Sequence, residues 1–239
     1  MTNTVIEESS ALRSLLNEYI SLPLGGKKIR CPYWVNRIRL GRIGPYGGKG
    51  TPTQIIEASN NCAKKEKVNF DILSEKEIIN FLVKNRIGID CSGFVFWMLD
   101  VLDKEKGGNG MLGKIPNSQG RFLQARTNTK TLFREDVTRP VLKINEIKIG
   151  DLIRLRGGTH VAIIISIERN KNVDKIVYTH SSSLTAINGV HEASINIVDI
   201  NLPLGKQIWS ENAKNNNNYG KESFWEDKGD GVRRLCAWE

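Results

Sequence analysis

The two halves of the chain follow different hydrophobic periodicities, and this division constrains the fold more than any other sequence feature. Through about residue 105, the apolar residues recur mainly at helical spacing. From residue 151 onward, β-branched runs bounded by Gly, Asn and Asp predict strands over 151–155, 160–167 and 175–180, with two further candidates over 194–200 and 232–238. Helices followed by a run of hairpin strands predict an α+β protein and argue against a doubly wound parallel sheet.

Four helices are predicted in the first half of the chain. The first covers residues 5–20 and ends before the breaker cluster Pro23-Leu24-Gly25-Gly26. The next two lie within a segment of about 50–86, one beginning at Thr51 or Thr53 and the other near Ser74. The fourth begins after Asp90. We expect the first helix to pack on the main core.

Composition excludes several functional classes. The 239 residues carry 35 Lys and Arg against 26 Asp and Glu, for a formal net charge of +9. Because these basic residues are spread along the chain, we expect no nucleic-acid partner. No apolar run of about 18 residues occurs, so we expect no membrane span. The four cysteines form no CxxC pair, which favours free thiols.

The first residues lack the positive start and the apolar block of a secretory signal. We therefore expect the protein to be cytoplasmic as synthesised, with leaderless export as the other route. We also expect a monomer.

Cys91 stands at the start of the most apolar predicted helix. Asp90 is a good N-cap residue, and residues 91–102 are almost continuously apolar. The first turn of a helix has unpaired backbone N–H groups at the positive end of the helix dipole, and both favour a thiolate. We therefore interpret Cys91 as a catalytic nucleophile whose pKa is lowered by its position.

Two of the three histidines are predicted to be neighbours on one face of the sheet. His160 begins the most apolar strand, His180 ends the next one, and turn residues lie between them around residue 170. In an antiparallel hairpin, any register that keeps the alternation of faces puts both rings on the same face. If the helix of Cys91 packs on that face, the three side chains come within reach of one another.

Other interpretations of the histidines are weaker. His191 follows Asn188-Gly189, a turn-like pair, so we expect it at the surface. The polar segment 211–221 is expected to be a loop without core residues. A Cys-His-His zinc site is another use of such a trio, but it lacks a fourth ligand, so we favour catalysis and expect neither metal nor cofactor.

Three segments resemble, in order, the motifs of the NlpC-like cell-wall cysteine peptidases, a branch of the papain-like superfamily. They are Asp90-Cys91-Ser92-Gly93, then Gly150-Asp151-Leu152 with His160-Val161-Ala162-Ile163, and Tyr178-Thr179-His180-Ser181-Ser182. The resemblance covers about residues 88–183. It implies a papain-like fold in which the helix that bears the nucleophile packs on a small antiparallel sheet. It also implies that Cys91 is the nucleophile, His160 the base and His180 the residue that orients the base.

The same resemblance implies a domain plan and a substrate cleft. It divides the chain into an N-terminal helix over 1–27 and a catalytic domain over 28–239 with a helical insertion at about 50–86. A tyrosine upstream of the nucleophile lines the cleft in this family, and Tyr33 and Tyr46 are the candidates here. Both lie further upstream of the cysteine than is usual for the family. Asp90 and Ser92, which flank Cys91, are expected beside the substrate.

The resemblance implies hydrolysis of an amide bond in a peptidoglycan peptide, of the D-glutamyl–diamino acid type, or in another small peptide substrate. One alternative is an acyltransferase, or an amidase acting on another cellular amide. Another is a catalytically silent domain that binds wall peptides. The complete trio argues against the silent domain, because binding alone requires neither a base nor a residue to orient it.

Overall fold

A computed structural model describes residues 4–36, 43–116 and 123–238, and it is organised around one antiparallel sheet of eight strands. The order is β4-β10-β5-β6-β7-β8-β9, with β1 beside β6, and each pairing is antiparallel. The strands are β1 (Val5–Glu8), β4 (Thr138–Val141), β5 (Leu152–Leu155), β6 (His160–Asn170), β7 (Asn172–Ser182), β8 (Gly189–Asn196), β9 (Ile208–Trp209) and β10 (Gly231–Leu235). The expected α+β class is therefore confirmed, although the sheet is larger than the small one expected.

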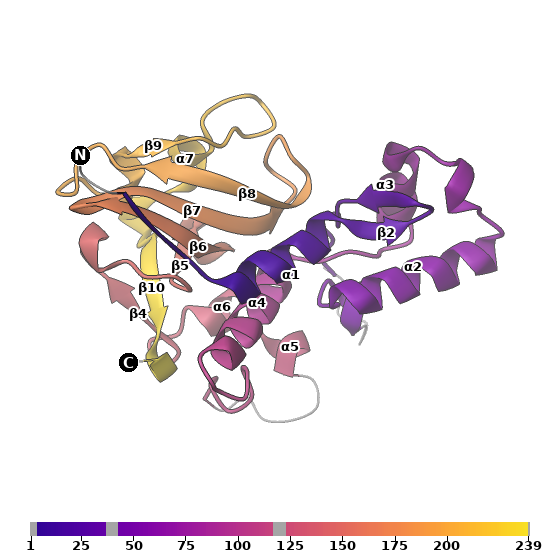
Figure 1. Ribbon diagram of the computed structural model, residues 1–239, viewed down its shortest axis with the longest axis horizontal. Helices are drawn as coiled ribbons and strands as arrows, with labels where there is room; N and C mark the ends of the chain where they lie inside the picture. The colour runs from indigo at the N-terminus through magenta and orange to yellow at the C-terminus, as the bar shows by residue number, and fades with distance from the viewer. Residues whose placement is uncertain (1–3, 37–42, 117–122, 239) are drawn as a thin grey trace.

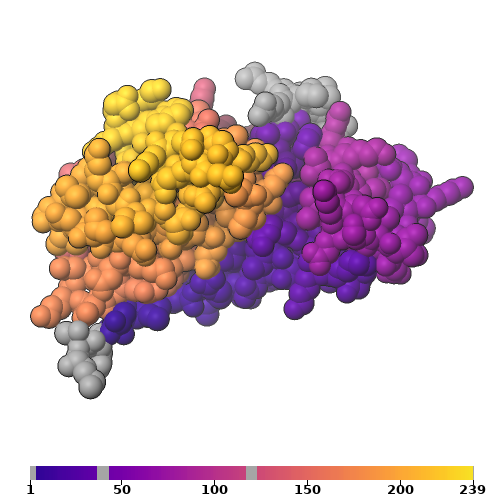
Figure 2. All heavy atoms as spheres, turned by 90° about the horizontal axis from the view of Figure 1, so that it is seen from above, coloured from indigo at the N-terminus to yellow at the C-terminus, as the bar shows by residue number. Residues whose placement is uncertain are grey.

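The longer helices all belong to the first half of the chain. They are α1 (Ser10–Ile20), α2 (Pro52–Glu66), α3 (Glu75–Lys84) and α4 (Cys91–Glu105), and the shorter ones are α5 (Leu123–Arg126), α6 (Thr129–Leu132) and α7 (Tyr219–Ser223). A small hairpin is formed by β2 (Leu22–Leu24) and β3 (Lys27–Ile29). It packs beside α2 and α3 at one end of the molecule (Figure 1). Seen from above, the indigo N-terminal residues lie between this end and the sheet (Figure 2). Each helix among the described residues is too short or too polar to span a lipid bilayer.

Side-chain caps set the helix starts that the sequence predicts. Thr51 and Ser74 each form a capping box, with Gln54 and Glu77 respectively. Asp90 caps α4 by accepting a hydrogen bond from the backbone N–H of Gly93 at 2.7 Å. The helix of Cys91 therefore begins where the sequence indicates.

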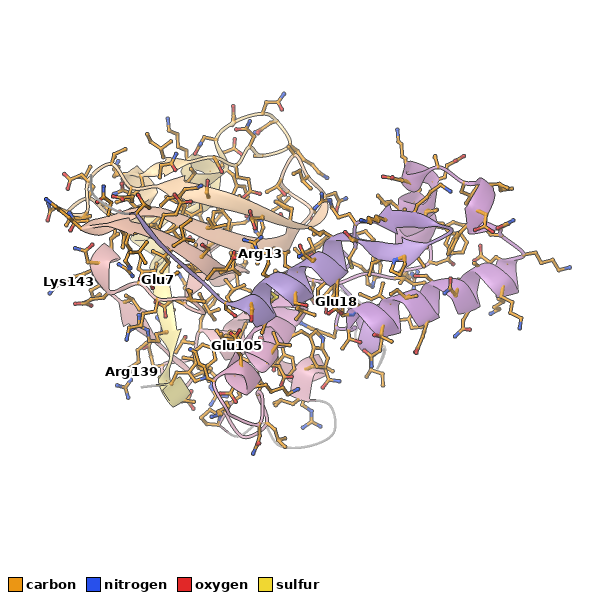
Figure 3. The ribbon with its side chains drawn as sticks, in the orientation of Figure 1. Glu7, Arg13, Glu18, Glu105, Arg139 and Lys143 are labelled. Carbon is orange, nitrogen blue, oxygen red and sulfur yellow. The ribbon has the colours of Figure 1, made fainter. Side chains whose placement is uncertain are left out.

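The first predicted helix is shorter than expected. Residues 5–8 form strand β1, which pairs with β6 beyond the end of β5, and the helix starts only after Ser9. The hydroxyl of Ser9 caps α1 by accepting from the N–H of Leu12 at 3.2 Å. Glu105, at the end of α4, accepts hydrogen bonds from Ser10 Oγ at 2.8 Å and from the N–H of Ala11 at 3.0 Å (Figure 3). This carboxylate ties the start of α1 to the end of α4.

The two faces of the sheet carry separate hydrophobic clusters. Side chains alternate along β6, so Val161 and Ile163 pack with α1 and α4, whereas Ala162 and Ile164 pack on the opposite face with Tyr178 and Tyr219. His180 belongs to this second face, because its ring contacts those of Tyr178 and Tyr219. The expectation that α4 packs on the face of the histidines is therefore wrong. The helix meets the sheet from the other side.

The β6–β7 hairpin contains two β-bulges, one in each strand, whose register shifts cancel. Ile165 is an extra residue in β6 and Asp174 is an extra residue in β7, and the tip lies at Lys171, between the paired Asn170 and Asn172. The turn is thus one residue beyond the predicted centre. Because the two shifts compensate, the predicted placement of His160 and His180 on one face is confirmed by their direct contact.

Candidate active site

Cys91 is held at the start of α4 by a close approach between that helix and the preceding glycine-rich loop. A Cβ atom at Gly93 would collide with the backbone carbonyl of Gly48, so only glycine fits at this position of the Asp-Cys-Ser-Gly segment. The indole of Trp97, one turn further along the helix, donates a hydrogen bond to the carbonyl of Lys49 at 2.9 Å. The loop and the first turns of α4 therefore form one packed unit.

A buried lysine stands beside the nucleophile, and sequence reasoning missed it. Lys49 Nζ lies 2.9 Å from Asp90 Oδ1, 2.6 Å from Ser92 Oγ and 2.9 Å from the carbonyl oxygen of Thr127. Ser92 Oγ also donates to Asp90 Oδ1 at 3.0 Å. Asp90 and Ser92, expected beside the substrate, are thus engaged within the protein. The signal for Lys49 was its place among glycines in Gly47-Gly48-Lys49-Gly50.

The thiol of Cys91 is neutral at rest, contrary to the expectation of a lowered pKa. Burial raises the pKa of Cys91 to about 12, and the charge of Asp90 adds to this effect. Lys49 and the backbone N–H groups of Val161 and Ser92 act in the opposite direction but do not outweigh burial. All four cysteines are free thiols, as expected.

The side chains of His160, His180 and Glu211 form a chain of close contacts that starts at the first residue of β6. His160 Nε2 lies 2.8 Å from His180 Nδ1, and His180 Nε2 lies 3.0 Å from Glu211 Oε1. The backbone N–H that faces the sulfur of Cys91 belongs to Val161, the residue that follows His160. Cys91 therefore meets the sheet at the first residues of β6, where the chain of contacts begins.

Two members of this cluster were not predicted. His191, expected at the surface, is buried in β8 and is the direct cross-strand partner of His180. Glu211 comes from the segment expected to lack core residues, yet it is buried and contacts both rings. Ala213 and Tyr219 of the same segment are also buried. The pair Asn188-Gly189 leads directly into a strand, and this is why the local turn signal misled.

The charges in the cluster balance around Glu211. Burial would raise the pKa of Glu211, but His180 and His191 hold it well below its ordinary value, so the carboxyl is ionised. Its second oxygen accepts a hydrogen bond from the hydroxyl of Tyr178 at 2.5 Å. Burial lowers the pKa of His160 well below its ordinary value, and the neighbouring His180 adds to this effect. His160 is therefore a neutral ring at rest.

A cleft of about 320 Å³ opens over Cys91. It is lined by Tyr33, Val35, Asn36, Gly47, Lys49, Asp90, Cys91, Ser92, Ala125, Asn128, Thr129 and Thr159. Tyr33 thus shares the cleft with Cys91. Tyr46 is not among the lining residues and packs against the hydrophobic cluster of α4, with its carbonyl accepting from the indole of Trp34 at 3.1 Å.

No protein-family model, curated protein or solved structure matches this chain.

The arrangement is suited to nucleophilic chemistry. A thiol at a helix start, a neutral imidazole and a second imidazole backed by a carboxylate are the groups that acyl transfer requires. Cys91 is one of the residues that line the cleft.

Proposed function

We propose that the protein is a cysteine hydrolase with a papain-like fold, which cleaves an amide bond in a peptidoglycan peptide of the D-glutamyl–diamino acid type. The observation that carries the proposal is the 2.8 Å contact between His160 Nε2 and His180 Nδ1, at the strand end that the Cys91 sulfur faces. Because Nε2 is engaged by His180, Nδ1 is the atom of His160 that serves as the base. The resemblance of the three motifs to NlpC-like peptidases supports the same roles.

In the first step, His160 Nδ1 takes the proton of the Cys91 thiol as the sulfur attacks the substrate carbonyl carbon. Because the thiol and the imidazole are both neutral at rest, proton transfer accompanies the attack rather than preceding it. The backbone N–H of Cys91, at the start of α4, stabilises the negative oxygen that develops.

In the second step, the protonated His160 gives its proton to the leaving amine, the C–N bond breaks, and a thioester to Cys91 remains. Water then attacks the thioester with His160 again as the base. The C–S bond breaks, the acid product leaves, and the sulfur recovers its proton.

His180 and Glu211 act on His160 from behind. When His160 Nε2 carries a hydrogen and donates it to His180 Nδ1, Nδ1 of His160 keeps the lone pair that the base needs. His180 Nε2 in turn donates to Glu211 Oε1. Glu211 is thus a positioning residue, two contacts away from the reacting atoms.

Purified peptidoglycan digested with the full chain tests the proposal. We expect soluble peptide fragments whose masses identify cleavage at the D-glutamyl–diamino acid bond, and no fragments from Cys91→Ala. Cys62→Ala is the matched control, because Cys62 lies on α2 and is not among the residues that line the cleft. Full activity of Cys91→Ala would remove the thiol from the mechanism, and cleavage at another amide would change the substrate class while leaving the chemistry.

A further inference from the structure

A buried triangle of ligand-type atoms lies on the sheet face away from α4. His180 Nε2 lies 3.0 Å from His191 Nε2 and 3.0 Å from Glu211 Oε1, and His191 Nε2 lies 2.6 Å from Glu211 Oε1. All three residues are buried. The proposed hydrolase uses His180 and Glu211 for positioning but gives His191 no role.

The short contact between His191 Nε2 and Glu211 Oε1 requires a proton or a metal ion between the two atoms. Nδ1 of His191 lies 2.9 Å from the carbonyl oxygen of Gly189, which can only accept, so Nδ1 carries a hydrogen. Nε2 of a neutral His191 then presents a lone pair to an ionised Glu211, which also only accepts. Two acceptor atoms 2.6 Å apart repel each other unless a proton or a metal ion lies between them.

The outer contacts of the triangle are those that orient metal ligands. Nδ1 of His180 is engaged by His160, Nδ1 of His191 by the Gly189 carbonyl, and Oε2 of Glu211 by the Tyr178 hydroxyl. In each of the three side chains, one polar atom is therefore fixed by an outer contact, and the other polar atom points into the triangle. The ring of Tyr219 contacts that of His180, and its hydroxyl is buried with no hydrogen-bond partner in the described part of the chain.

We propose that His180 Nε2, His191 Nε2 and Glu211 Oε1 bind one divalent transition-metal ion of the zinc class. Two imidazoles and one carboxylate suit Zn²⁺ or Co²⁺, whereas Mg²⁺ and Ca²⁺ prefer oxygen ligands alone. Ligand atoms of a tetrahedral zinc ion lie about 3.3 Å apart, so two sides of the triangle lengthen by about 0.3 Å and the His191–Glu211 side by about 0.7 Å on binding. The fourth position is left to solvent or to the hydroxyl of Tyr219.

For the proposed hydrolase, on which this consequence rests, the bound ion is an inhibitor. When the ion takes the Nε2 lone pair of His180, the hydrogen of that ring moves to Nδ1 and is donated to His160 Nε2. The remaining hydrogen of neutral His160 then lies on Nδ1, the atom that must accept the proton of Cys91. The metal form therefore holds the base in the inactive tautomer.

Cobalt titration of the chelator-treated full chain tests the site, with the visible absorption of tetrahedral Co²⁺ as the signal. We expect saturation at one equivalent and displacement by Zn²⁺. His191→Gln and Glu211→Gln should each weaken binding at least tenfold. Glu222→Gln, which replaces a partly exposed carboxylate on α7, and Cys91→Ala are the matched controls and should bind as the parent does.

Three results would overturn the site: no cobalt signal, equal binding by His191→Gln, or loss of binding in Cys91→Ala. Far-UV circular dichroism shows whether each variant folds. If the ligand variants do not fold, Tyr178→Phe decides, because it removes only the hydrogen bond to Glu211 Oε2. It should weaken cobalt binding about tenfold, and unchanged binding would contradict the proposal.

Inhibition is measured separately from binding. Zn²⁺ should slow peptide hydrolysis by the parent protein, a chelator should restore the rate, and His191→Gln should be insensitive to Zn²⁺. If cobalt binds but Zn²⁺ leaves the rate unchanged, the inhibitory consequence is wrong. If cobalt binds but the protein hydrolyses no peptide either with or without bound metal, the proposed function is wrong while the metal site is supported.

Discussion

The Nε2 atom of His160 lies 2.8 Å from Nδ1 of His180, and this contact joins the strand end at Cys91 to the buried carboxylate of Glu211. The contact spans two strands, and each ring lies on the same face of the sheet although α4 packs on the other face. The cleft and the buried polar cluster are therefore connected through β6 itself.

Replacing His160 should slow the reaction of Cys91 with iodoacetamide. Because the thiol is buried and neutral, it needs a base to react, and His160→Ala removes that base. We expect the labelling rate of Cys91 at pH 7 to fall at least tenfold. Mass spectrometry of the labelled peptides measures all four cysteines at once, so Cys62 and Cys236 serve as internal controls. Equal labelling of Cys91 in both proteins would show that His160 does not act on this thiol.

Replacing His180 should lower kcat far more than it raises KM. His180→Ala leaves the thiol and the cleft intact but frees the ring of His160 to adopt the wrong tautomer. We expect kcat to fall by roughly two to four orders of magnitude, with KM changed by less than about threefold. Steady-state hydrolysis of a muropeptide measures both constants. His180→Asn, which offers a carbonyl acceptor to His160 Nε2, should recover part of kcat, and a purely structural role would predict no such recovery.

Removing the charge of Lys49 should destabilise the protein strongly. Lys49→Met leaves the buried carboxylate of Asp90 without its ion-pair partner, and breaking a buried pair costs about 3–5 kcal/mol in the free energy of unfolding. Lys84→Met is the matched control, because Lys84 and Glu66 lie 3.8 Å apart and Lys84 is largely exposed. Its loss should change stability by less than about 0.5 kcal/mol. Urea unfolding of both variants gives the comparison, and equal midpoints would contradict the structural role of Lys49.

The contribution of Glu105 to stability should depend on pH. Slight burial raises the pKa of this carboxyl, but hydrogen bonds from Ser9, the N–H of Ala11 and Ser10 outweigh it, so the folded pKa lies below the ordinary value of 4.5. A lowered folded pKa stabilises the protein above pH 4.5, and this stabilisation is lost as the pH falls through the folded pKa.

Glu105→Gln should therefore lower the free energy of unfolding by up to about 1 kcal/mol at pH 7, since most of the group is in solvent. The difference from the parent should shrink as the pH falls below 4.5. Thermal melting above and below pH 4.5 measures it, and a difference that grows on acidification would reverse the assignment.

The sequence predicted those parts of the site that depend on local patterns. A helix start after Asp90 follows from side-chain capping, and the shared face of His160 and His180 follows from strand alternation. Both patterns operate over a few residues, so they can be found without tertiary contacts. The same is true of the helix starts at Thr51 and Ser74.

The missed residues depend on contacts between distant segments. Glu211 reaches the cluster from a polar segment, and Lys49 becomes buried only because its loop packs against α4. Polar composition predicted exposure for the segment of Glu211, and no local pattern singled out Lys49. The predicted direction of the Cys91 pKa shift was wrong for a related reason. The position at a helix start predicts a lowered pKa, but burial raises it, and burial depends on contacts that no local pattern contains.

The paired irregularities in β6 and β7 determine where this hairpin can change length during evolution. Deleting Ile165 alone restores regular pairing between Ile164 and Tyr178 and between Ser166 and Val177, so His160 and His180 keep their common face. Inserting one residue between His160 and Ile163 turns one ring to the side of α4 and separates the pair. Changes in the length of this hairpin should therefore be tolerated at or beyond Ile165, whereas the segment between His160 and Ile164 should keep a constant length.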